Sequence, residues 1–282
     1  MIDLHCHSTF SDGSDQPDAI VAKAEGLALR ALALTDHDTL DGLDGFLDMQ
    51  KKASVRLVPG IEMSCMFAGR DLHVLGLFVG HRDPMFRDRI KGLKTRRLKR
   101  NEQIFTNLRA MGITLGELGG RSGEVLTRGH IATALVMQGH AADRAEAFRR
   151  YLDEDAPAYA PFEQLSPATA FGWIREAGGL PAIAHPGRFA KGAFIWDAAM
   201  RDFRDWGCLG AEALYPDHSA TETAYFLRLC GELGMAPTGG SDYHGSMKPG
   251  CELGTGRGSL NVPDEILDGL LDKLKEAGIR GH

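Results

Sequence analysis

Two histidines separated by one residue are the first candidates for chemistry in this chain. The first twelve residues, M-I-D-L-H-C-H-S-T-F-S-D, lead from a short apolar stretch directly into His5 and His7. In an extended strand, side chains at i and i+2 leave the same face, so both imidazoles can reach one metal ion. Asp12 follows in a polar, glycine-containing loop, where its carboxylate can reach a neighbouring ion. A single His-x-His pair is equally compatible with structural hydrogen bonds, so the interpretation depends on further signals.

Similar residues recur along the chain, directly after predicted strands. His37 follows one such strand, Glu62 ends another, His185 follows a third, and Asp242 and His244 follow the last. In α/β barrels and open α/β sheets, the carboxyl ends of the strands meet on one face and carry the chemistry. Residues almost 240 positions apart are therefore expected to meet at one mouth.

His73 needs a separate argument, because it lies near the start of its predicted strand. A turn at Ala68-Gly69-Arg70 predicts a hairpin over residues 61–79. Such a hairpin would bring His73 back to Ser64 and close to Glu62. With it, the candidate metal ligands are His5, His7, Asp12, His37, Glu62, His73, His185, Asp242 and His244.

The candidate ligands are all imidazoles or carboxylates. This donor set suits Mn, Fe or Zn, and the lack of thiolates argues against a purely structural zinc site. Nine ligands exceed what one ion can use, so two or three divalent ions per chain are expected, with Glu62 as a bridge. Manganese is the favoured ion, with zinc or iron as alternatives. Clustered divalent ions suit phosphoryl displacement, because they stabilise both the attacking and the leaving oxygen.

The elements that must position these residues alternate between strand and helix. Seven strands are predicted, at residues 1–4, 30–35, 55–61, 71–79, 179–184, 208–214 and 236–240. This alternation indicates an α/β fold with a parallel sheet closed or nearly closed into a barrel, and an open doubly wound sheet is the alternative. Residues 86–155 have only helical patterns. We therefore predict a barrel formed by residues 1–80 and 156–282, with a helical insertion at residues 81–155 that covers the active-site mouth.

Composition places limits on the class of protein. The chain has 282 residues, a net charge of −6 and five cysteines without a C-x-x-C pair. The negative charge argues against a protein that coats nucleic acid over its whole surface. No apolar run approaches the ~20 residues needed to span a bilayer. The cysteine usage and an N-terminus unlike a signal peptide favour a cytoplasmic protein with reduced thiols.

The predicted insertion supplies candidate substrate contacts. Eight of the fourteen residues from Arg87 to Arg100 are basic, which suits either attraction of phosphate or a solvated helix face. Arg97 and Asn101 interrupt the apolar stripe of this helix and would face substrate if the helix covers the mouth; a buried ion pair is the alternative. Thr127 suits a helix N-cap, with Arg128 and His130 beside a terminus that favours phosphate.

Arg188 is the remaining candidate substrate contact. It follows His185 by three residues, and a guanidinium there can engage two oxygens of a metal-bound phosphate. The predicted substrate-binding residues are therefore Arg97, Asn101, Arg128, His130 and Arg188.

Together these motifs resemble the PHP (polymerase and histidinol phosphatase) family, part of the wider amidohydrolase-like group. The matching segments are H-C-H-S-T-F-S-D-G (5–13), T-D-H-D (35–38), G-I-E (60–62), L-H-V-L-G (72–76), A-H-P-G-R (184–188) and G-S-D-Y-H (240–244). The resemblance implies a distorted seven-stranded (β/α) barrel with a trinuclear metal centre. It implies one ion on His5, His7, Glu62 and Asp242, a second on Glu62, His73 and His185, and a third on Asp12, His37 and His244. Some family members have a histidine at the position of Asp12.

Within the family, the insertion and the T-R-G-H segment at 127–130 are most similar to the 3′,5′-nucleotide bisphosphate phosphatases. Relatives in that subgroup also trim RNA 5′ ends. The resemblance implies removal of the 3′-phosphate from adenosine 3′,5′-bisphosphate (pAp), leaving AMP. We expect a metal-bound hydroxide to attack phosphorus in line, with Asp242 and His244 as positional candidates for proton transfer.

Three alternatives remain open at this point. The first is a 5′-to-3′ exoribonuclease acting on short 5′-phosphorylated RNA. The second is a metal-dependent amidohydrolase or deaminase, which shares His-x-His but predicts a neutral pocket. The third is a degenerate metal-binding module serving a larger polymerase. The expected partner is a small nucleotide, or a short RNA end in the first alternative; no membrane and no stable protein partner are inferred.

Overall fold

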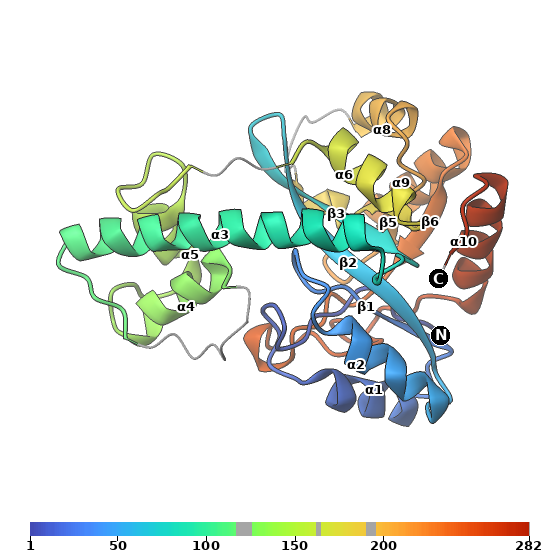
Figure 1. The fold of residues 1–282 in the computed structure, drawn as a ribbon, viewed down its shortest axis with the longest axis horizontal. Coiled ribbons are helices and arrows are strands. Elements are labelled where there is room, and N and C mark those ends of the chain that lie inside the picture. The colour runs from blue at the N-terminus through green and yellow to red at the C-terminus, as the bar shows by residue number, and fades with distance from the viewer. Residues whose placement is uncertain (117–125, 162–164, 190–195, 282) are drawn as a thin grey trace.

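A computed structural model describes residues 1–116, 126–161, 165–189 and 196–281 of the chain (Figure 1). Its centre is a curled, six-stranded mixed sheet in which the strands follow the order of the sequence. The pairs β1–β2, β4–β5 and β5–β6 are parallel, whereas β3 is antiparallel to both of its neighbours. The strands are β1 (Ala31–Leu34), β2 (Arg56–Phe67), β3 (Arg70–Leu77), β4 (Leu180–Ile183), β5 (Gly210–Leu214) and β6 (Ala236–Gly239). The predicted α/β class is confirmed.

The N-terminal segment connects the two edge strands of the sheet. The amide of Asp3 donates to Ala31 of β1, and the amide of Leu4 donates to Gly239 of β6. This segment makes isolated bridges but no continuous strand, so the structure has six strands where the sequence predicted seven. The segment is very short and its side chains turn into the site within a few residues, which leaves little backbone for a regular ladder.

The predicted hairpin at residues 61–79 is confirmed by the pairing of β2 with β3. Ala68 and Gly69 form its two-residue turn, both with positive φ angles of 49° and 73°, as a tight hairpin turn requires. In the resulting register Ser64 lies opposite His73 and Glu62 lies opposite Leu75. The antiparallel direction of β3 therefore returns His73 to the mouth of the sheet.

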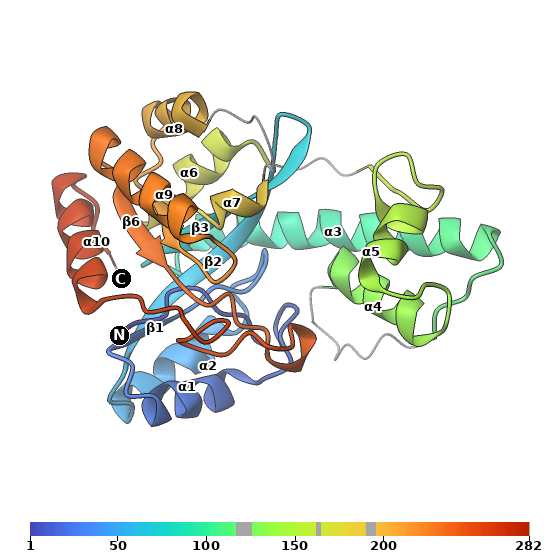
Figure 2. The same ribbon diagram turned by 180° about the vertical axis from the view of Figure 1, so that it is seen from behind.

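Helices cover the outside of the sheet. α10 packs against β6, α9 against β5, and α6 against β4 and β3, while α2 packs against β2 (Figures 1 and 2). The strands are buried along most of their length because the outer face carries helices and the inner face carries the site. The helices of this layer are α1 (Pro17–Gly26), α2 (Leu43–Asp48), α6 (Pro167–Glu176), α7 (Pro186–Phe189), α8 (Trp196–Asp205), α9 (Ala220–Leu233) and α10 (Asp264–Glu276), with 3-10 turns at Met49–Lys51 and Gly245–Met247.

A helical lobe extends from one side of the sheet. It consists of the second half of α3 (Pro84–Ala110), α4 (Arg128–Met137), α5 (Arg144–Ala147) and a π-helical turn at Phe148–Leu152 (Figure 1). The lobe has a hydrophobic cluster of its own, which includes Ile104 and Leu108 of α3. The first half of α3 instead contributes Phe86, Ile90 and Leu93 to the main core. One helix thus joins the two hydrophobic clusters. Within the described residues, no helix has the length and apolar character required to cross a bilayer.

Candidate metal centre

Four side chains form the innermost cluster of the site. They are His5, His7, Glu62 and Asp242, and one ligand atom of each lies within 4.8 Å of the others. The Nε2 atoms of His5 and His7 lie 3.2 Å and 3.1 Å from Glu62 Oε2. Asp242 Oδ1 lies 3.5 Å and 3.3 Å from the same two nitrogens. All four side chains are almost completely buried.

Backbone pairing at the end of β6 explains why residues so far apart in sequence meet here. The N-terminal segment runs beside the chain that follows β6: the amide of Asp242 donates to the carbonyl of His5, and the amide of His7 donates to the carbonyl of Tyr243. Asp242 has a positive φ of 53°, a conformation that non-glycine residues rarely adopt. This turn directs its carboxylate toward the two imidazoles.

Glu62 also faces histidines on its other side. His73 Nδ1 and His185 Nε2 each lie 2.9 Å from Glu62 Oε1. His37 Nδ1 lies 3.2 Å from Oε2, and His37, Glu62 and His73 form a second potential metal group. The two oxygens of one carboxylate therefore face different sets of histidines, which is the geometry of a bridging ligand.

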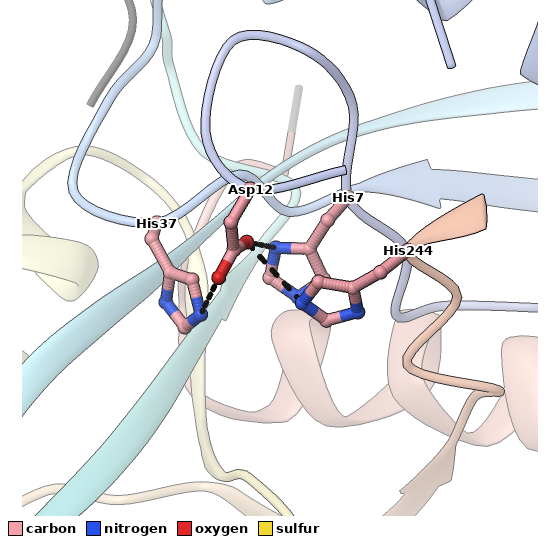
Figure 3. Close-up of side chains that lie close together, drawn as sticks. All are labelled: His7, Asp12, His37 and His244. Atoms are coloured by element: carbon pink, nitrogen blue, oxygen red, sulfur yellow. Dashed lines mark ion pairs between the residues drawn. The ribbon is translucent and has the colours of Figure 1, made fainter. Parts of the chain in front are cut away.

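A third group surrounds Asp12 (Figure 3). His244 Nε2 lies 3.2 Å from Asp12 Oδ1, and His7 Nδ1 lies 3.6 Å from the same oxygen. His37 Nε2 lies 3.7 Å from Oδ2. His7 and His37 each present their second ring nitrogen to this group, so they connect it to the other two. The structure brings together all nine residues predicted as ligands.

The donor set fits divalent cations. Among the described residues, His37 Nδ1, Glu62 Oε2 and His73 Nδ1 are buried atoms with no hydrogen-bond partner. Burial of a polar atom costs free energy unless the atom has a hydrogen-bond partner or binds a metal ion. A cation in the site would bind these atoms directly. We refer to the nine residues as the metal cage; the identity of the ions is not fixed by this donor set.

Burial and the neighbouring charges shift the pKa values of several cage residues. Burial lowers the pKa of His5, but Glu212, Glu62 and Asp242 raise it well above its usual 6.5. Burial would raise the pKa of Glu62, but the surrounding histidines hold it well below 4.5. For His37 and His185, burial dominates and lowers the pKa to about 3. These two imidazoles are neutral at pH 7, the form that binds metals.

A cavity of about 450 Å³ opens above the cage. Its other walls are strongly basic. The lining includes Arg97, Arg100, Arg128, His130, Arg144, Arg188 and Lys248, together with Phe148 and Phe189. An anionic ligand of the size of a nucleotide would be in contact with cations on several sides.

Comparison with known proteins is consistent with this geometry. The model of the PHP domain matches residues 3–156, which is more than half of the chain. The chain belongs to the PHP family. It is a metal-dependent phosphoesterase of that family, and its site is a multinuclear metal site.

Relatives of this chain are named for different activities. The chain is 32% identical to a 3′,5′-nucleoside bisphosphate phosphatase from Chromobacterium violaceum, over 90% of each protein. It is 34% identical to a 5′-3′ exoribonuclease from Haemophilus influenzae, over 86% of this chain and 89% of that protein. A solved structure of an amidohydrolase from C. violaceum with bound sulfate is 31% identical and superposes with a TM-score of 0.83, over 96% of each chain.

Arg128, Arg188 and His130 are three of the predicted substrate contacts that line the cavity. Arg128 forms an ion pair with Asp71 on the β2–β3 hairpin, and Arg188 is half-exposed, with Nη1 3.2 Å from the Tyr215 hydroxyl. The ring of His130 accepts a hydrogen bond at Nδ1 from the amide of Thr127. In its neutral form this ring therefore carries its proton on Nε2.

The other two predicted contacts are engaged inside the protein. Arg97 lies at the cavity wall, but its guanidinium donates to Asp38 and, at 2.8 Å, to the Ser64 hydroxyl. Asn101 is not among the residues that line the cavity, and it donates to the carbonyl of Leu126 at 2.7 Å. The structure thus corresponds to the buried-ion-pair alternative for Arg97.

Thr127 connects the helical lobe to the metal cage. It is the N-cap of α4, as predicted, and its hydroxyl accepts from the amide of His130. The same hydroxyl lies 3.5 Å from Asp12 Oδ2. The N-cap residue of α4 is therefore in direct contact with a cage residue, and Arg128 follows it directly.

Several residues at the site were not found from the sequence. Tyr215 and Lys248 donate to Asp242 Oδ2 at 2.9 Å and 2.8 Å, so the oxygen that faces away from the histidines is fully engaged. Glu212, inside β5, contacts His5 and the backbone of His185. A lone acid in the apolar segment G-A-E-A-L was a usable signal for Glu212, because buried carboxylates need a partner. Tyr215 and Lys248 carry no comparable signal.

Proposed function

We propose that this chain removes the 3′-phosphate from nucleoside 3′,5′-bisphosphates, converting pAp to AMP and phosphate. The observation that carries the proposal is the arrangement of one cavity between the metal cage and a wall of arginines. Such a cavity suits a substrate with a phosphate at each end: one over the cage, where the ester is cleaved, and one on the basic wall. The named activity of the C. violaceum relative supports this choice.

The proposed roles follow the positions of the side chains. Divalent ions held by the nine cage residues would supply Lewis acidity toward the reacting phosphate and lower the pKa of bound water. Arg188 contacts Asp242 at the edge of the cage, at 3.4 Å, and would offset charge on the phosphate that reacts. Arg128 and the Nε2–H of His130 would hold the second phosphate. In the overall hydrolysis, the oxygen of water forms a bond to phosphorus and the bond from phosphorus to the 3′-oxygen breaks. The 3′-oxygen leaves with a proton as a hydroxyl group.

Proton transfer to the leaving 3′-oxygen by Asp242 or His244 stays a prediction. Both oxygens of Asp242 are engaged, and its pKa is lowered well below 3.8 by nearby histidines and Lys248 in spite of its burial. His244 Nδ1 lies 2.9 Å from the carbonyl of Asp242, to which it can only donate, and this directs the lone pair of Nε2 toward Asp12. These contacts favour ligand roles for both residues over proton transfer.

We also propose that residues 81–155 act as the cover of the mouth, with residues 1–80 and 156–282 forming the barrel. The contact between Thr127 and Asp12 and the ion pair between Arg128 and Asp71 support this division. Manganese is our proposed native ion, with zinc or iron as alternatives.

A second candidate is 5′-to-3′ exoribonuclease activity on short 5′-phosphorylated RNA. It is favoured by the relative from H. influenzae, which matches as closely as the phosphatase. In that case a phosphodiester lies over the cage and the basic wall holds an RNA 5′ end. Amide hydrolysis or deamination fits less well, because a wall rich in arginine does not suit a neutral substrate.

A phosphate-release panel tests the proposal. The Mn-loaded protein is assayed with 3′,5′-bisphosphates, 3′-monophosphates, 5′-monophosphates and short 5′-phosphorylated RNA. We expect the highest kcat/KM for 3′,5′-bisphosphates. A higher kcat/KM for RNA, measured by release of mononucleotides, would support the second candidate and overturn the first.

Arg188→Ala provides the internal test of the phosphatase assignment. It should lower phosphate release from every ester in the panel, whereas Arg204→Ala, which removes an exposed arginine paired with Asp205 on α8, should not. Unchanged turnover of phosphate esters by the Arg188 variant would rule out its proposed role.

A further inference from the structure

Glu212 is a fully buried carboxylate within a strand. It lies in β5, and none of its surface is exposed. Burial of a carboxylate is costly unless hydrogen-bond donors satisfy both of its oxygens. Its neighbours in the strand, Ala211 and Ala213, are small and apolar, so the donors must come from adjacent segments.

The two oxygens of Glu212 contact two different segments of the metal cage. Oε1 lies 3.0 Å from Nδ1 of His5. Oε2 accepts a hydrogen bond of 2.7 Å from the backbone amide of His185. His185 has a positive φ of 28°, so a strong acceptor at its amide stabilises an unusual backbone conformation two residues after the end of β4.

The far sides of the same two histidines face the two oxygens of Glu62. His5 Nε2 lies 3.2 Å from Glu62 Oε2, and His185 Nε2 lies 2.9 Å from Glu62 Oε1. Glu212 therefore contacts two histidines, His5 and His185, whose Nε2 atoms face different oxygens of Glu62. When the ring is neutral, as a metal-binding imidazole is, donation from Nδ1 leaves the lone pair on Nε2.

We propose that Glu212 is a positioning residue for the metal cage. It holds His5 in the tautomer with the proton on Nδ1 and fixes the backbone that carries His185, so that both Nε2 atoms point toward Glu62. Hydrogen bonds of this kind raise the basicity of a ligating imidazole and restrict its orientation. The inference rests on the presence of cations in the cage and not on which phosphate ester is hydrolysed.

Asp3 provides a matched control within the same protein. Its side chain is also fully buried, but its oxygens accept from the backbone amides of His5, Ser241 and Gly254, and it has no hydrogen bond to an imidazole ring among the described residues. Asp3→Asn therefore removes a buried charge without removing a partner of an imidazole ring. We expect it to lower the thermal stability and to leave the tautomer of His5 unchanged.

The test uses Glu212→Gln and Glu212→Ala in the full chain, with zinc as a diamagnetic probe. Zinc affinity is measured by competition with a chelator, and the tautomer of each histidine by two-dimensional ¹H–¹⁵N NMR. We expect the Glu212 variants to bind zinc about 10- to 100-fold more weakly, as is typical when such a partner is removed. Zinc affinity equal to that of the wild type in folded Glu212→Gln would overturn the proposal.

The wild-type protein gives an answer even when the variants do not fold. In its zinc-loaded form, the ring proton of His5 should be on Nδ1. A proton on Nε2 would exclude the proposed role of Glu212. Both readouts are independent of substrate, so failure of the bisphosphate assignment would leave them unaffected, and the reverse also holds.

Discussion

The metal cage and the basic wall are opposite sides of one cavity, and they are built in different ways. The cage residues come from the ends of strands and are held by backbone pairing, as with Asp242 beside His5. The wall residues come largely from the helical lobe, with long side chains that pair with acids at the rim, as Arg128 does with Asp71. The donor groups of the cage suit cations, and the basic side chains of the wall suit anions. The candidate chemistry therefore depends on strand ends held by backbone pairing, and the candidate recognition depends on long side chains of helices.

The largest effect should follow from Glu62→Ala. Because Glu62 faces histidines with both oxygens, its loss should remove more than one manganese ion per chain, measured by elemental analysis. Phosphate release should fall by about 10³-fold, or roughly 4 kcal/mol of transition-state stabilisation. His81→Ala is the control, because His81 pairs with Asp44 outside the cage. Full metal content in the Glu62 variant would contradict the bridging role.

Arg97→Ala should affect stability more than substrate recognition. It leaves Asp38 buried without its main partner, which typically costs about 3–5 kcal/mol. Denaturant unfolding measures the loss, and Lys99→Ala, an exposed neighbour on α3, should change little. An unchanged free energy of unfolding together with a raised KM would instead support the substrate contact expected from the sequence.

The loss caused by Arg97→Ala should also depend on pH. Burial would raise the pKa of Asp38, but Arg97 lowers it below its usual 3.8. The contribution of the pair to stability is therefore fully present above pH ~4 and is lost as the pH falls through the lower folded-state pKa. The difference in unfolding free energy between wild type and variant should shrink in that range. A constant difference from pH 7 to pH 3 would show that the pair is not responsible.

Arg128→Ala should distinguish recognition of the second phosphate at the basic wall from hydrolysis at the metal cage. Loss of a charge-assisted contact to the second phosphate should raise KM for 3′,5′-bisphosphates roughly 10- to 100-fold. KM for 3′-monophosphates, which lack that phosphate, should change little. Arg204→Ala serves again as the control. Equal losses for both substrates would place Arg128 outside the proposed recognition of the second phosphate.

Asp71→Asn should give the smallest effect, with the opposite sign. The carboxylate of Asp71 competes with substrate phosphate for Arg128, and partly exposed ion pairs of this kind are worth up to about 1 kcal/mol. KM for 3′,5′-bisphosphates should therefore fall by up to about fivefold. In the Arg128→Ala background, the same change should have a much smaller effect on KM, because the competition for Arg128 no longer exists. A similar effect in both backgrounds would argue against competition at Arg128.

The sequence was sufficient for the cage because strand ends converge in this class of fold. His37, His185 and Asp242 could be placed together from position alone, and His73 from the hairpin turn at Ala68-Gly69. Closure of the sheet was predicted less well. Residues 1–4 were expected to form a full strand, but so short a segment makes only isolated bridges to its neighbours.

The partners of polar side chains could not be read from spacing. The helical stripe correctly placed Arg97 and Asn101 on the buried face of α3, but periodicity defines a face and not the group opposite. Asp38 and the carbonyl of Leu126 occupy those positions. Glu212 and Tyr215 were missed for the same reason, since each acts through a contact with a segment far away in the chain.

Helix α3 links the sheet that carries the metal cage to the helical lobe. Its first half packs in the main core and its second half packs in the lobe that carries Arg128. One continuous helix therefore connects the two parts of the protein. Seven additional residues in a helix advance it by roughly 10 Å and return almost the same face. A seven-residue insertion within α3 would therefore move the lobe away from the sheet and leave every residue of the metal cage in place.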